Sequence, residues 1–156
     1  MSRRATEKGP GAPGEAEAAK RAGREVSIDW LELSVKDIDV DVVFGLLAEH
    51  LVYSQLRSSL SAADRRGEIE FFRTRNGVEV DFIVTLEGQE TWAIEVKSGQ
   101  VSEEDLKPLL LFRDYVPFGR RSSLRLAVVS LGDAQKRTRK GCLILGLNEL
   151  LREMGL

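Results

Sequence analysis

The sequence predicts an α/β fold in which one mixed β-sheet carries helices on its faces. The order of patterns supports this: a helix comes first, three extended segments follow it, and helix, strand, strand and helix complete the chain. With 156 residues, 42% hydrophobic and 31% charged, the chain can bury a sizeable core as one soluble globular domain. It shows no internal repeat.

Residues 1–27 are rich in Gly, Ala, Glu, Lys and Arg and contain almost no large apolar side chain. Such a segment cannot offset the entropy lost on ordering, so we expect a disordered tail over 1–27. The folded domain is then expected over 28–156. Deleting the tail should leave the melting temperature nearly unchanged.

A helix is predicted over residues 41–60, which contain no proline. A set of mostly apolar residues recurs there at helical spacing, namely Val43, Leu46, Leu47, His50, Leu51 and Ser54. The opposite side is also apolar, so we expect a helix that is buried nearly all round. Glu49 would then be a buried carboxylate that needs a partner or a metal. The alternative is that Glu49 lies at the rim of the helix and reaches water.

Three extended segments follow a polar loop at 61–67. The first two, over 68–73 and 78–84, are joined by Asn76-Gly77, which is the strongest short hairpin signal. The third, over 91–97, follows a loop around Gly88 and forms a second hairpin with the segment before it.

The second half of the chain supplies the remaining elements. A helix is predicted over 102–114, with Ser102 as its N-cap and a kink at Pro108. A strand over 124–131, a basic loop over 132–141, a short strand over 142–145 and a last helix over 147–154 follow.

Composition excludes several classes of protein and of site. Neither a secretory signal nor an apolar run of roughly 18 residues is present, so we expect no membrane partner. A single cysteine, Cys142, excludes an internal disulfide and indicates a reducing compartment, the cytoplasm. One Cys and one His, His50, make a Cys/His zinc site nearly impossible, and a Ser-His-Asp hydrolase would depend on His50 alone. Chemistry must therefore come from carboxylates and lysines.

Charge is unevenly distributed although the net charge is only −2. Residues 29–105 contain 17 acidic and 7 basic side chains, whereas residues 113–140 contain 8 basic and 2 acidic ones. This asymmetry is consistent with an acidic pocket beside a basic docking surface. Ordinary solvated surface charge is the alternative.

The second hairpin suggests a specific pair of carboxylates. A hairpin centred on Gly88 places Asp81 opposite Glu95, and Glu79 opposite Lys97, while aligning the apolar residues of both strands. Like charges directly opposite cost about 0.2–1 kcal/mol, and a divalent cation between them would remove the repulsion. Oxygen ligands suit Mg²⁺ or Mn²⁺. Alternatively, both carboxylates face solvent and pair with Lys97 or Arg73.

These residues also resemble a known superfamily. The segments VEVDF and AIEVK, with a Glu in a preceding helix, are similar to the PD-(D/E)XK nucleases, which have a restriction-endonuclease-like αβββαβ core. Asp81 matches the Asp of the motif, Glu95-Val96-Lys97 matches (D/E)-x-K, and Glu49 matches the helical Glu.

The resemblance implies a metal-dependent nuclease that hydrolyses DNA. Asp81, Glu95 and the Val96 carbonyl would hold Mg²⁺ or Mn²⁺, and Glu49 would complete the set or lie next to it. Lys97 would orient the attacking water or stabilise charge on the phosphate. Arg73 and Arg75 are candidate phosphate contacts, as is the basic stretch over 136–140, which ordinary surface charge also explains.

A closer resemblance covers roughly residue 40 to the C-terminus. The segments 45–50, 71–82, 93–98 and 101–107 resemble the nuclease-like domain of unknown function at the C-terminus of many prokaryotic AAA-type ATPases. This sequence departs from that arrangement because it contains no G-x-x-x-x-G-K-[ST] loop for ATP. A truncated gene, a fragment and a stand-alone descendant remain open. The alternative function is a catalytically inactive module that binds DNA or a protein.

Overall fold

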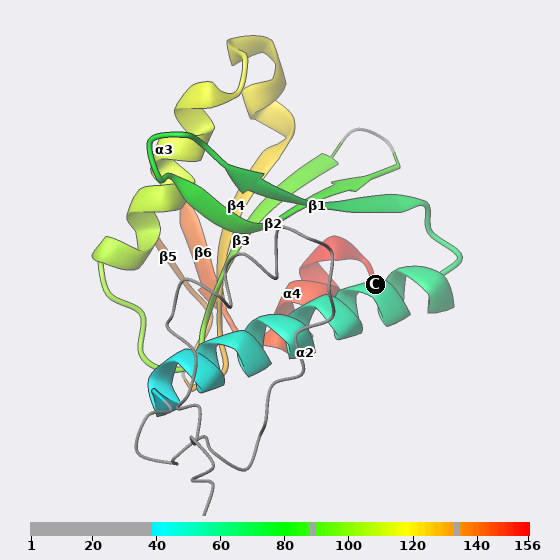
Figure 1. Ribbon diagram of the computed structural model, residues 1–156. Helices are drawn as coiled ribbons and strands as arrows, with labels where there is room; N and C mark the ends of the chain where they lie inside the picture. The colour runs from blue at the N-terminus through cyan, green and yellow to red at the C-terminus, as the bar shows by residue number, and fades with distance from the viewer. Residues whose placement is uncertain (1–38, 88–89, 133–134) are drawn as a thin grey trace, which may run out of the picture. The chain divides into compact units, whose positions relative to one another are not determined.

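A six-stranded mixed β-sheet forms the centre of the computed structural model (Figure 1). The structure describes residues 39–87, 90–132 and 135–156, so the expected tail over 1–27 and the start of the expected domain lie outside the described residues. In sheet order the strands are β1 (Gly67–Arg73), β2 (Glu79–Leu86), β3 (Glu90–Lys97), β4 (Leu124–Ser130), β6 (Cys142–Leu145) and β5 (Arg137–Arg139).

The sheet is mixed, which confirms the predicted α/β class. Strands β1, β2 and β3 pair antiparallel, β3 pairs parallel with β4, and β4 pairs parallel with β6. The Asn76-Gly77 hairpin signal is also confirmed, because Gly77 adopts a positive φ of 82° in the turn between β1 and β2.

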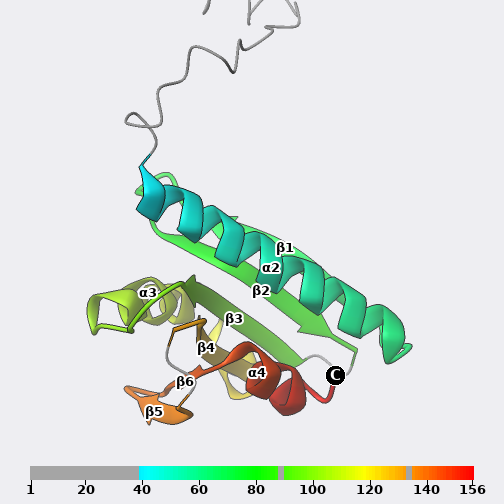
Figure 2. The same cartoon turned by 90° about the horizontal axis from the view of Figure 1, so that it is seen from below.

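Helices cover both faces of the sheet (Figure 2). Helices α2 (Val40–Ala62) and α4 (Leu147–Met154) pack on one face, and α3 (Lys107–Tyr115) packs on the other. Along β3, Trp92 and Ile94 face the α2 side and Ala93 faces the α3 side. The sheet therefore has a hydrophobic core on each side, as alternation along a fully covered strand requires. None of the described helices is long and apolar enough to cross a membrane.

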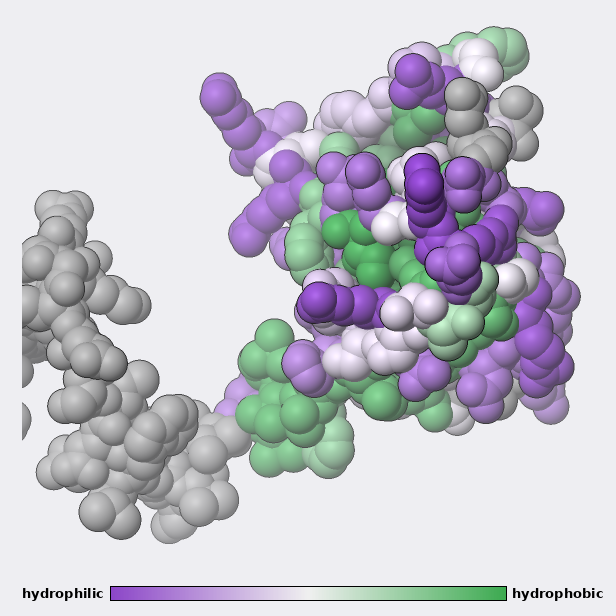
Figure 3. All heavy atoms as spheres, turned by 90° about the vertical axis from the view of Figure 1, so that its right-hand side faces the viewer, coloured by the Kyte–Doolittle hydropathy of each residue, from purple (hydrophilic) through white to green (hydrophobic). Residues whose placement is uncertain are grey.

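The burial of α2 differs from the prediction. The side chains that pack on the sheet are Ala48, Val52, Leu56 and Leu60, each four residues from the next. The positions that were expected to face the core are exposed except for Ser54, with Leu46 at 60% and Leu47 at 58%. The expectation of a helix buried nearly all round is therefore wrong along the whole helix, which buries one stripe and exposes most of its apolar residues in the first half. Figure 3 shows the hydrophobic surface that the exposed apolar side chains of the first half of α2 form.

The segment expected to be one helix over 102–114 is divided in two. A short 3₁₀ turn over Glu104–Leu106 precedes α3, and Pro108 lies in the first turn of α3, where its missing N–H breaks no helical bond. No kink is needed. Ser102 is not an N-cap: its backbone N–H and its hydroxyl both donate to the Asp105 carboxylate, each at 2.7 Å.

A strand that the sequence analysis missed lies in the expected basic loop. β5 pairs antiparallel with β6 around a two-residue turn at Lys140 and Gly141, whose φ angles are 52° and 82°. Two successive positive φ angles are typical of the tight turns that join hairpin strands. The turn was hard to recognise because Lys140 stands where Asn or Asp is usual.

Candidate functional site

The register of the β2–β3 hairpin is the one predicted, but its ladder is shorter. Phe82 pairs with Ile94, Ile83 with Ala93 and Val84 with Trp92, as a hairpin centred on Gly88 requires. The ladder ends at Phe82 and Ile94, so Asp81 and Glu95 do not form the next pair. The predicted pairing of Glu79 with Lys97 is also wrong, because the ladder does not extend to these residues. Glu79 pairs instead with Arg73 on β1, with Glu79 Oε2 3.6 Å from Arg73 Nε.

A β-bulge in β2 explains why the ladder ends there. The pairing of β1 with β2 shifts register between Glu70 and Phe72, which leaves Asp81 and Phe82 together opposite Phe71. As a result Val80 packs in the core on the α3 side and Phe82 in the core on the α2 side. Strict alternation along 78–84 would put Val80 and Phe82 on one face, so the bulge changes which side Val80 faces.

The Asp81 side chain bridges β2 and β3 just beyond the last ladder pair, Phe82 and Ile94. Its Oδ2 accepts a hydrogen bond from the backbone N–H of Val96 at 2.7 Å. The side chain thus takes the place of a ladder partner. Burial raises the pKa of Asp81, and the Val96 hydrogen bond and the charge of Lys97 oppose that increase only in part.

Glu95 is a buried carboxylate on the α3 side of β3, only 7% exposed. Its Oε1 accepts a hydrogen bond from Lys97 Nζ at 2.9 Å. Its Oε2 is buried and has no hydrogen-bond partner among the described residues. Burial and the nearby charge of Asp81 raise the pKa of Glu95 from 4.5 to about 7, against the opposing effect of Lys97.

Lys97 is held between two carboxylates. Its Nζ lies 2.9 Å from Glu95 Oε1 and 3.6 Å from Asp105 Oδ1. Burial lowers the pKa of Lys97, but the hydrogen bond and charge of Glu95, with the charge of Asp105, outweigh it and raise the pKa overall. Burial acts to raise the pKa of Asp105, but the hydrogen bonds from Ser102 and the charge of Lys97 lower it overall. Sequence reasoning missed Asp105, because its spacing from Ser102 signals only the local contact with Ser102 and its contact with Lys97 depends on the fold.

Glu49 reaches the same place from α2. It is half-buried, as the rim alternative expected, and lines an open pocket of about 480 Å³ together with Asp81 and Glu95. The other lining residues are Asn76, Gly77, Val78, Glu79, Lys107, Pro108 and Leu111. Burial and the charges of Asp81 and Glu79 raise the pKa of Glu49. The structure thus brings the three carboxylates to one pocket, although they come from α2, β2 and β3.

A metal site requires several donor side chains close together. In the part of the chain that the structure describes, no three Asp, Glu, His or Cys side chains are close enough together to bind one ion. Glu49 is therefore not grouped with Asp81 and Glu95 as a third ligand, and the alternative, that it lies next to the ligand set, stays a prediction. Mg²⁺ commonly binds one or two carboxylates and keeps waters and substrate phosphates as its other ligands. Asp81 and Glu95 fit such a site, because the buried Oε2 of Glu95 has no hydrogen-bond partner among the described residues.

The candidate phosphate contacts fall into two groups. Arg75 lies next to the pocket residue Asn76, and Arg73 is exposed and pairs with Glu79. The basic stretch is largely paired with acidic side chains: Lys136 pairs with Glu153, and Arg139 and Lys140 both pair with Glu103. That pairing agrees with ordinary surface charge over 136–140.

Comparison with known proteins adds one finding. Neither the curated proteins nor the solved structures contain a match to this sequence. A family model described as a domain of unknown function, DUF4143, matches residues 44–150, a range that includes Glu49, Asp81, Glu95 and Lys97. Because this match covers more than half of the sequence, the chain belongs to the DUF4143 family.

Proposed function

We propose that this domain is a metal-dependent nuclease that hydrolyses phosphodiester bonds in DNA. The observation that carries the proposal is the buried Glu95 carboxylate, which lies near Asp81 and Lys97 with one oxygen lacking a hydrogen-bond partner among the described residues. A buried carboxylate oxygen without a partner is costly, and a bound cation would satisfy it. We expect the activity in the cytoplasm, where Cys142 would stay reduced.

The two strand carboxylates would hold the ion. Asp81 and Glu95, with the Val96 carbonyl, would bind Mg²⁺ or Mn²⁺ in this proposal. A bound ion of this kind polarises a phosphate and lowers the pKa of a bound water. Asp81 keeps its hydrogen bond to Val96 N–H, which fixes the carboxylate at the end of the ladder. Positive charge from the ion would also favour the ionised form of both carboxylates.

The remaining side chains would act on the substrate. Lys97 supplies a positive charge next to the two carboxylates, and its ammonium group also pairs with Asp105. In this position Lys97 would stabilise negative charge that develops on the phosphate. Glu49 faces the pocket from α2 and would accept hydrogen bonds from water there. Arg75 and Arg73 lie beside the pocket and would contact neighbouring phosphates.

A second function is supported by a different observation. No three metal-binding side chains come together within the described residues, and Lys97 already occupies one oxygen of Glu95. A nuclease-like module that binds DNA or a protein without cleaving would show the same features. Such a module would leave DNA intact with any metal.

Cleavage of a panel of DNA and RNA forms with Mg²⁺ or Mn²⁺ tests the proposal. Wild type should cut, and Lys97→Met should lose about 100-fold or more in rate, the usual cost of removing a group that stabilises transition-state charge. Lys136→Met is the matched control, because Lys136 pairs with Glu153 and does not line the pocket. It should retain activity. Wild type that binds but never cuts would support the binding module instead.

A further inference from the structure

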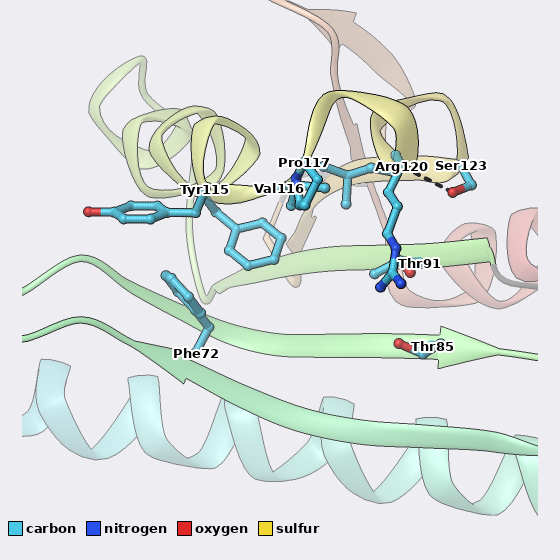
Figure 4. Close-up of a pocket in the computed structure, with 10 residues that line it drawn as sticks. Phe72, Thr85, Thr91, Tyr115, Val116, Pro117, Arg120 and Ser123 are labelled. Atoms are coloured by element: carbon cyan, nitrogen blue, oxygen red, sulfur yellow. Dashed lines mark hydrogen bonds between the residues drawn. The ribbon is translucent and has the colours of Figure 1, made fainter.

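A second pocket lies on the α3 side of the sheet and shares no lining residue with the carboxylate pocket. It has a volume of about 490 Å³ and opens between β1–β3 and the chain that leaves α3 (Figure 4). That chain continues as a 3₁₀ segment, Phe118–Ser123. The pocket lies beyond the end of α3 at Tyr115, where the 3₁₀ segment takes the place of α3 above Thr85 and Thr91.

One end of this pocket is aromatic. Phe72 from β1 and Phe112 from α3 meet edge to face, with ring centroids 4.7 Å apart. Tyr115 follows one turn later, 5.7 Å from Phe72, and remains 55% exposed. An exposed aromatic ring beside a buried one, Phe112, and a half-buried one, Phe72, offers a flat face on which a planar ring can stack.

The other end is polar and positively charged. Thr85 and Thr91 are cross-strand partners on β2 and β3, and both line the pocket. Arg120 extends toward them from the 3₁₀ segment (Figure 4). Its guanidinium forms no ion pair with any described residue, whereas Arg125 pairs with Glu90 nearby. The free donors of Arg120 suit a phosphate, which they can contact through two hydrogen bonds.

We propose that this pocket binds a nucleoside monophosphate unit. The base would stack on Tyr115, the two threonine hydroxyls would meet polar atoms of the base or sugar, and Arg120 would hold the phosphate. A purely apolar ligand would leave Arg120 and the hydroxyls without partners, and an inorganic anion would leave the aromatic end unused. The volume lies within the roughly 300–1,000 Å³ range of small-ligand pockets. The unit can be a free nucleotide or one nucleotide of a single strand, which presents the same chemistry.

Binding of defined probes to the full chain, in EDTA, tests the pocket independently of metal-dependent cleavage. The probes are AMP, adenosine, inorganic phosphate and the tetranucleotide (dA)₄, measured by titration calorimetry. AMP should bind at least about tenfold more tightly than adenosine or phosphate, because each fragment lacks half of the contacts. Tighter binding of (dA)₄ than of AMP would indicate a strand as the source, and the reverse a free nucleotide.

Two variants and a control separate the contacts. Arg120→Gln should reduce AMP affinity about tenfold, to that of adenosine, and leave adenosine unchanged. Tyr115→Ala should weaken AMP and adenosine alike by about fivefold or more. Arg57→Gln, on α2, should change nothing. Both test residues are exposed, and an unchanged melting temperature would show that the variants fold. Failure of AMP and (dA)₄ to bind wild type at millimolar concentration, or equal affinity in all variants, would overturn the proposal.

Discussion

The Glu95 carboxylate is buried, and among the described residues only Lys97 donates a hydrogen bond to it. The motif alone could name Glu95, together with Asp81, Lys97 and Glu49, because their residue types and spacing are a sequence property. It could not name Asp105, which lies outside the motif and reaches Lys97 only through the fold. The bulge at Asp81 could not be predicted from the sequence either, because it depends on how β1 pairs with β2.

The raised pKa of Glu95 makes stability depend on pH. Because the pKa is about 7 in the folded chain against 4.5 ordinarily, the folded state favours the protonated form. Its contribution to the free energy of unfolding is therefore complete below about pH 4.5 and lost as pH rises through about 7. Without metal, wild type should be more stable at about pH 5 than at about pH 8 by roughly 1–3 kcal/mol from this group.

Urea denaturation in EDTA at both pH values measures this difference. Glu95→Gln should lose most of it, and the remainder should reflect Asp81 and Glu49, whose pKa values are raised in the same direction. An identical pH dependence in wild type and Glu95→Gln would contradict this account of the buried carboxylate.

Asp81 has a structural and an electrostatic role that two substitutions separate. Asp81→Asn keeps an oxygen that can accept from Val96 N–H but removes the charge beside Glu95. Without metal it should be as stable as wild type or more so. Asp81→Ala leaves Val96 N–H without its partner and should cost about 1–2 kcal/mol. Denaturation midpoints of the three proteins test this, and an Asn variant as unstable as the Ala variant would show that charge repulsion is unimportant.

At the scale of the element, α2 shows a case in which the spacing of apolar residues does not predict the buried face of a helix. Leucine, valine and phenylalanine surround its first half, so no contrast between faces marks the buried stripe. The true contacts, Ala48, Val52, Leu56 and Leu60, follow from the tertiary packing. The strands were easier to predict, because Asn76-Gly77 and the alternation after it define the hairpins locally.

Two leucines of α2 should respond differently to truncation. Leu56 is 0% exposed and Leu47 is 58% exposed. Leu56→Ala should cost about 2–5 kcal/mol through lost burial and the cavity left behind. Leu47→Ala should stay within about 0.5 kcal/mol. Chemical denaturation compares them, and similar losses at both positions would mean that the first half of α2 is also packed against apolar groups in solution.

The loop after Lys97 is held against the end of β4. Leu131 N–H donates to Lys97 O at 2.9 Å, and Ser130 Oγ donates to Gly99 O at 2.7 Å. A Cβ on Gly132 would lie 3.0 Å from Ser98 O and 3.1 Å from Gly99 Cα, whereas one on Gly99 would meet nothing within 4 Å. Gly132→Ala should therefore shift this loop and cost about 1–2 kcal/mol, while Gly99→Ala should be nearly neutral. Equal melting temperatures for the two variants would rule out the close approach.

At the scale of the whole molecule, the candidate site forms where the two helical layers meet across the sheet. Glu49 comes from α2 and Leu111 from α3, on opposite faces, yet both line the pocket where β2 and β3 separate. The carboxylates and the order of elements could be predicted from the sequence, but the pocket between β2 and β3 could not. The fold also reduces the charge asymmetry between residues 29–105 and 113–140, because Glu103 of the acidic segment pairs with Arg139 and Lys140 of the basic one.

Stabilisation by Mn²⁺ tests the central claim most directly. Wild type should gain melting temperature as Mn²⁺ is added, because an ion that binds only the folded chain stabilises it by mass action. Asp81→Asn and Glu95→Gln should each lose this gain. Asp114→Asn, which removes an exposed carboxylate that does not line the pocket, should keep it. A wild type that ignores Mn²⁺, or a gain that survives in both site variants, would contradict a metal centre at Asp81 and Glu95.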